Sequence, residues 1–157
     1  MTSEPSPGAI DPDLQRQLAV DLFNGVWALL EQPDRTRADD DRMLHAAHAS
    51  RYHWEMVGEP VNLVRGEWQC SRVYAMLGRA EPSIHHARRC LELCQEHGIG
   101  DFDLAFAYEA LARGYALAGD AEQTRDMLEH AREAGERITA DDDRELFERD
   151  LSSIPAV

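Results

Sequence analysis

Lysine is absent from this sequence, and all 16 basic residues are arginine. The absence excludes sites that depend on a lysine, namely a pyridoxal Schiff base, a Walker-type phosphate loop and the phosphate-binding lysine of a kinase. Glycine-rich phosphate loops and the Gly-x-Ser-x-Gly turn of hydrolases are also missing. Short motifs therefore point to none of these enzyme classes.

Positive charge is scarce as a whole. The 157 residues carry a formal net charge of −14, and nucleic-acid binding needs a cationic surface, so we expect no nucleic-acid partner. The acidic excess lies at the two ends of the chain, because residues 51–100 contain six acidic residues and six arginines. We interpret the acidic ends as solvated faces and the balanced middle as the place to search for a site.

Long apolar runs are missing as well, since no stretch approaches the roughly 20 residues that cross a bilayer. The opening segment, MTSEPSPGAIDPD, is acidic and proline-rich, which is the opposite of a signal peptide. We expect a cytoplasmic protein without membrane contact. We also expect residues 1–10 to form a disordered tail and residues 11–157 to form a single domain.

Cysteine is rare, and its positions do not suggest a metal site. The three cysteines, Cys70, Cys90 and Cys94, are an odd number and lack the spacing of a zinc ribbon. Cys90 and Cys94 lie one helical turn apart on a face that is otherwise apolar. We therefore predict buried free thiols at these positions.

The rest of the chain has the periodicity of helices separated by glycines. Gly58, Gly78, Gly98 and Gly119 follow one another at intervals of 20, 20 and 21 residues, each after an apolar-periodic segment. A helix commonly ends in a residue that adopts positive φ, which favours glycine. No alternating strand pattern occurs, so we predict an all-α protein. The seven predicted helices cover residues 11–31, 38–57, 60–78, 81–97, 101–118, 120–137 and 140–152.

Two of the helix pairs resemble tetratricopeptide repeats (TPR). The motif pairs two helices through an aromatic residue, a small residue, a tyrosine, a glycine turn, and small residues on the second helix. Residues 105–134 match it at Tyr108, Leu111, Ala112, Tyr115, Gly119, Asp120, Thr124, Leu128 and Ala131. Residues 67–93 match it more loosely at Cys70, Ser71, Tyr74, Gly78, Ser83, Ala87 and Cys90. The resemblance covers about half of the chain.

The repeat length departs from the family. Tyr74 and Tyr115 are 41 residues apart, as are Gly78 and Gly119, whereas the family repeats at about 34 residues. The resemblance implies antiparallel helix hairpins stacked into a short right-handed superhelix with a concave groove. In that family the groove binds an extended peptide or a chain terminus. The exposed end of such a short array also allows a homodimer, in which a second copy closes it.

Arginine and aromatic residues are predicted on the concave side. The helix over 60–78 presents Asn62, Arg65, Trp68 (or Gln69) and Arg72, and the helix over 101–118 presents Phe102, Phe106, Glu109 and Arg113. Tyr52 is assigned to the same groove. We predict that it holds a peptide, a protein partner or an acidic small ligand, because arginines fork onto carboxylates and aromatics supply contact area. The alternative pairs these arginines with the chain's own acids.

A histidine-rich stretch suggests a second function, a metal-dependent enzyme. Asp41, His45, His48 and Tyr52 share one face of the helix over 38–57. His45 and His48, with Glu67 or His86 from later helices, have the chemistry of a divalent transition-metal site. The competing interpretation is that these histidines pair with a carboxylate between packed helices. The sequence identifies no catalytic residue.

Overall fold

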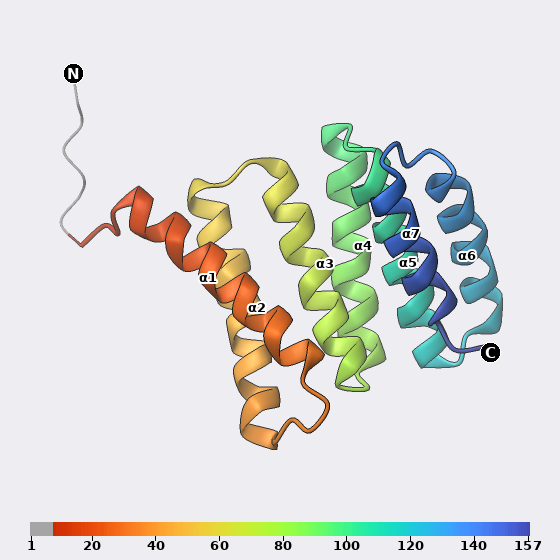
Figure 1. Ribbon diagram of the computed structural model, residues 1–157, viewed down its shortest axis with the longest axis horizontal. Coiled ribbons are helices and arrows are strands. Elements are labelled where there is room, and N and C mark those ends of the chain that lie inside the picture. The colour runs from red at the N-terminus through yellow and green to blue at the C-terminus, as the bar shows by residue number, and fades with distance from the viewer. Residues whose placement is uncertain (1–7) are drawn as a thin grey trace.

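The computed structural model describes residues 8–157, which form seven α-helices and no strand (Figure 1). The helices are α1 (Pro12–Glu31), α2 (Arg37–Val57), α3 (Pro60–Met76), α4 (Ala80–His97), α5 (Asp101–Ala118), α6 (Ala121–Gly135) and α7 (Asp141–Ser152). The all-α class and the seven predicted helices are confirmed, with ends that differ by a few residues. Residues 1–7 of the predicted tail lie outside the described residues.

The helices pack as consecutive pairs, α1 with α2, α3 with α4 and α5 with α6. The first helices of these pairs and then α7 contact one another in order, so that α1 meets α3, α3 meets α5 and α5 meets α7. Within residues 8–157, the second helices α2, α4 and α6 make no such contacts with each other. In Figure 1, α1 crosses in front of α2, and α7 crosses in front of α5. Helix α3 lies between α1 and α7. This arrangement is compatible with a helical repeat fold.

The prediction that a helix ends at a glycine with positive φ is confirmed at Gly78, Gly98 and Gly119, where φ is 74°, 65° and 76°. The same explanation is wrong at Gly58, which ends α2 with a φ of −91°. A Cβ at this position would lie 2.7 Å from the carbonyl oxygen of Trp54 and 3.0 Å from Cβ of Asn62. Gly58 therefore permits a close approach of α2 and α3, which a periodicity argument does not detect.

The last helix is held against the preceding pair by one aromatic anchor. The Phe147 ring is 2% exposed and packs against Phe106 of α5, with ring centroids 5.3 Å apart. Gly135 at the end of α6 makes room for it, because a Cβ there would overlap the Phe147 ring. Asp101 at the start of α5 makes a second contact, because its carboxylate accepts hydrogen bonds from the backbone N–H and the hydroxyl of Thr139, which precedes α7. These contacts fix α7 beside α5.

The three cysteines are buried free thiols, as the sequence predicts. Burial raises the pKa of the Cys70 thiol to about 12, so this sulfur offers no thiolate near neutral pH. Among residues 8–157, no helix combines the length and the apolar character that crossing a bilayer requires.

Candidate ligand-binding cleft

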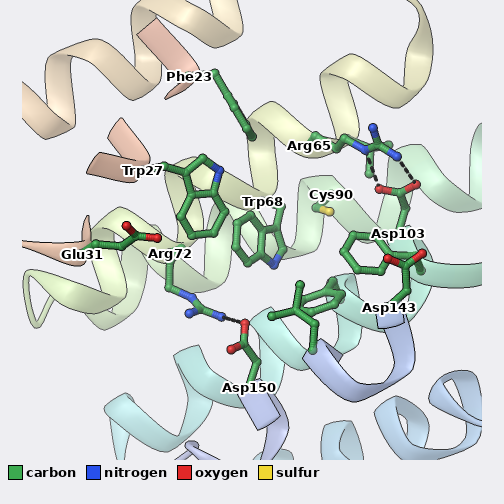
Figure 2. A pocket seen from close by; sticks show the side chains of 14 residues that line it. Phe23, Trp27, Glu31, Arg65, Trp68, Arg72, Cys90, Asp103, Asp143 and Asp150 are labelled. Carbon is green, nitrogen blue, oxygen red and sulfur yellow. Dashed lines mark hydrogen bonds and ion pairs between the residues drawn. The ribbon is translucent and has the colours of Figure 1, made fainter. Parts of the chain in front are cut away.

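A cleft of about 540 Å³ opens between the first helices of the pairs and α7 (Figure 2). Five of the residues predicted for the groove line it: Arg65, Trp68, Arg72, Phe102 and Phe106. The opposite walls come from α1, with Phe23, Trp27 and Glu31, and from α7, with Asp143, Leu146 and Asp150. Two helices in which the sequence analysis predicted no site residue therefore form walls of the cleft.

Aromatic rings form a continuous wall across the cleft. Trp27 of α1 lies 5.5 Å from Trp68 of α3, measured between ring centroids, and Trp68 meets Phe106 of α5 edge-on at 5.8 Å. Phe102 continues the wall, 4.6 Å from Phe106. Trp68 also packs against three separate clusters of the hydrophobic core, whereas Trp27 belongs to none of them. Trp68 thus both packs against the hydrophobic core and lines the cleft, whereas Trp27 lines the cleft without belonging to a core cluster.

Both arginines of the cleft are paired with carboxylates of the chain. Arg65 donates through Nε and Nη2 to the two oxygens of Asp103, at 3.0 and 3.3 Å. This hydrogen bonding raises the pKa of Arg65. Arg72 donates through Nη2 to Asp150 at 3.2 Å and to Glu109 at 3.2 Å. Both guanidinium charges are thus balanced by carboxylates of the chain, although the Arg65 side chain remains half exposed.

Glu109 and Arg113, also predicted for the groove, lie behind its wall. The Glu109 side chain is fully buried and accepts hydrogen bonds from Nε and Nη2 of Arg113 at 2.9 and 2.7 Å. Arg113 also donates to the carbonyl oxygen of Asp150 at 2.9 Å and to the Ser153 hydroxyl at 2.8 Å. Together with Arg72, these residues form a charged network that joins α3, α5 and the end of α7.

Two other carboxylates of the cleft are unpaired. Glu31 and Asp143 line the cleft, and neither makes an ion pair or a side-chain hydrogen bond with another residue of 8–157. The lining therefore contains four carboxylates and two guanidinium groups, both of which are already neutralised. At the wall itself, the Trp68 indole Nε1 is buried without an acceptor. Such an orphaned donor carries a free-energy cost.

Asn62, also predicted for the groove, belongs to neither the cleft lining nor this network, and Tyr52 lies apart from both. Its side chain is 58% exposed on α2, where the ring meets that of His53 at 5.8 Å.

The cleft residues of α1, which the sequence analysis did not predict, follow helical spacing, since Phe23, Trp27 and Glu31 recur every four residues. This spacing was available in the sequence, but it does not tell which neighbour the face meets.

No protein-family model, curated protein or solved structure matches this chain. The chemistry of the cleft is therefore argued from its side chains. The lining has no histidine, serine or threonine, and its one cysteine, Cys90, is buried. The pKa of Cys90 is raised well above its usual value by the hydrogen bond with Cys94 and by burial. The lining offers aromatic faces, carboxylates and two paired guanidinium groups, all of which can contact a ligand.

The predicted metal ligands are brought together only in part. His48, Glu67 and His86 meet between α2, α3 and α4, whereas His45 and Asp41 are exposed to solvent. Glu67 accepts from Arg51 at 3.0 Å and binds Nδ1 of His86 at 2.6 Å. In the described part of the chain, no three His, Cys, Asp or Glu side chains are arranged to hold a metal ion. The metal-dependent enzyme therefore stays a prediction.

The polar side chains of His48, Glu67, Tyr74 and His86 contact one another between α2, α3 and α4. His48 lies 2.9 Å from the Tyr74 hydroxyl, and the Tyr74 ring stacks on His86 at 5.6 Å. Burial and the neighbouring His86 lower the pKa of His48, which favours its neutral form. Burial alone would raise the pKa of Glu67, but the hydrogen bond and charge of His86 and the charge of Arg51 outweigh burial and lower it. The surroundings therefore favour the charged form of Glu67 and the neutral form of His48.

This arrangement makes stability depend on pH. The pKa of His48 is lower in the folded protein than its ordinary value of 6.5, so the unfolded chain binds a proton first as the pH falls. We expect the free energy of unfolding to be maintained well above pH 6.5 and to fall as the pH drops below 6.5. Urea unfolding at a series of pH values measures this dependence. His48→Gln is expected to flatten it, and equal slopes in both proteins would contradict the assignment.

Proposed function

We propose that this chain is a TPR-like binding module that holds an extended segment of a protein partner in the cleft. The observation that carries the proposal is the aromatic-walled cleft of about 540 Å³, which is built by α1, α3, α5 and α7 in succession. Its walls carry binding groups on every one of these helices. Contacts distributed along a row of helices suit an extended ligand better than a compact one.

Three further observations support the relation to tetratricopeptide repeats. The small residues of the motif are buried where helices of a pair meet, including Ser71, Ser83, Ala112 and Thr124. The glycine turns at Gly78 and Gly119, 41 residues apart, both adopt positive φ. Contacts between successive first helices, but not between successive second helices, are the pattern that leaves one concave face.

Trp27 is the position at which binding can be tested apart from folding. Its ring lines the cleft but belongs to none of the four core clusters, so Trp27→Ala is expected to leave most of the stability in place. A buried aromatic anchor commonly contributes about 2 kcal/mol or more to binding at an interface. We therefore expect Trp27→Ala to weaken the binding of a cleft ligand by a factor of about 30.

The experiment is a selection from a random peptide library displayed on phage, with the immobilised protein as the target. Binders are then measured against the wild type, Trp27→Ala and a surface control, Glu129→Gln on the exposed side of α6. We expect enriched peptides that bind the wild type and the control equally and lose binding to Trp27→Ala. Absence of enrichment, or peptides indifferent to Trp27, would refute a cleft-binding function.

A further inference from the structure

The charge of the cleft indicates which kind of peptide it takes. Both guanidinium groups in the lining are paired, Arg65 with Asp103 and Arg72 with Asp150, so neither adds an unbalanced positive charge to the groove. Glu31 and Asp143 in the same lining have no partner among residues 8–157. A ligand therefore meets two carboxylates that form no ion pair or hydrogen bond of their own, beside aromatic rings.

The positions of these two carboxylates are not explained by the needs of their helices. Glu31 is the last residue of α1, where the negative end of the helix dipole disfavours a carboxylate. Asp143 lies in the first turn of α7, but Asp141 and Asp142 already supply negative charge there. Asp143 nevertheless lines the cleft. Glu31 therefore places negative charge at the cleft without a partner, whereas the charge of Asp143 also acts on the Arg65 guanidinium and helps to raise its pKa.

Figure 2 shows Glu31 on the α1 side and Asp143 on the α7 side, with Trp27 and Trp68 between them. This order of groups suits cationic side chains, which bind carboxylates through their charged heads and pack their stems on aromatic faces. The protein itself contains one example. The Arg72 guanidinium lies 5.0 Å from the Trp68 ring centroid and 3.2 Å from Asp150.

We infer that the segment bound in the cleft is a basic peptide, whose arginine or lysine side chains reach Glu31 and Asp143 while its apolar side chains cover Trp27. The inference rests on the proposed function and specifies its ligand. It reverses the acidic small ligand suggested by the arginine content of the groove. The net charge of −14 acts in the same direction, because it attracts cationic ligands and repels anionic ones.

The experiment compares three labelled peptides of about ten residues, in which leucine alternates with arginine, glutamine or glutamate. Fluorescence anisotropy measures their binding to the wild type and to two double variants. The first, Glu31→Gln with Asp143→Asn, removes the unpaired carboxylates of the cleft. The second, Glu129→Gln with Glu133→Gln, makes the same change of net charge on exposed α6 residues and controls for long-range attraction. Trp27→Ala reports on the cleft itself.

We expect the arginine peptide to bind the wild type about tenfold more tightly than the glutamine peptide, and the glutamate peptide to bind least. The cleft double variant should lose most of this preference, and the α6 double variant should keep it. Equal binding of the arginine and glutamine peptides, both dependent on Trp27, would overturn the inference and leave the proposed function standing. If neither peptide depends on Trp27, the inference and the proposed function both fail.

Discussion

Replacing Glu109 with alanine is expected to lower the free energy of unfolding by about 3–5 kcal/mol. Glu109 is fully buried, and its carboxylate accepts hydrogen bonds from both Arg72 and Arg113. The side chains of these arginines are only 14% exposed, so removal of the carboxylate leaves two desolvated cations beside each other. A loss of this size is a large share of the stability of a small domain, which is typically about 5–15 kcal/mol.

Urea unfolding at neutral pH measures this change. Glu129→Ala removes the same side chain from an exposed position on α6 and is expected to change the unfolding free energy by less than about 0.5 kcal/mol. The loss at Glu109 should also loosen α7, because Arg72 and Arg113 both hold Asp150. A cost below about 1 kcal/mol would show that the network does not join these helices as described.

Replacing Trp68 with alanine is expected to cost about 3–5 kcal/mol as well, for a different reason. The Trp68 ring packs against three of the four core clusters, and it also contacts Trp27, Phe106 and the Arg72 guanidinium. Its removal opens a cavity where α1, α3 and α5 meet. Trp68 is therefore unsuitable for separating binding from folding, although its place in the predicted groove made it the obvious choice.

Thermal unfolding of Trp68→Ala and Trp27→Ala side by side tests this distinction. We expect a clear drop in the melting temperature for Trp68→Ala and a much smaller one for Trp27→Ala. Trp68→Phe keeps part of the packing and is expected to lie between the wild type and Trp68→Ala. Equal melting temperatures for the two alanine variants would mean that Trp68 has no special role in the core.

Most of the fold could be predicted from periodicity. The apolar stripes and the glycine stops located all seven helices, because helix ends have local requirements that a short segment reveals. Gly58 shows the limit of this reasoning. Its glycine is required by the approach of Trp54 and Asn62, and such a contact between two helices has no local sequence signal. Similarly, nothing near Gly135 indicates that the Phe147 ring packs against it.

The candidate site was predicted less completely. Arg65, Trp68, Arg72 and Phe106 do line one cleft, because helical spacing and the pairing of α3 with α5 place them together. The sequence could not show that α1 and α7 supply the opposite walls, since this depends on how distant helices pack. It also could not decide whether the arginines pair with a ligand or with Asp103 and Asp150. Ion pairing between helices is a matter of a few ångströms, which spacing does not fix.

The most direct measurement uses the three tryptophans as reporters. Trp27 and Trp68 line the cleft, whereas the Trp54 ring lies beside Arg16, outside the lining. The indole N–H signals in a ¹H–¹⁵N correlation spectrum are followed while the arginine–leucine or glutamine–leucine peptide is added. We expect the Trp27 and Trp68 signals to shift with added peptide and the Trp54 signal to shift much less. Unchanged Trp27 and Trp68 signals with both peptides, or a shift confined to Trp54, would contradict a peptide-binding cleft between α1, α3, α5 and α7.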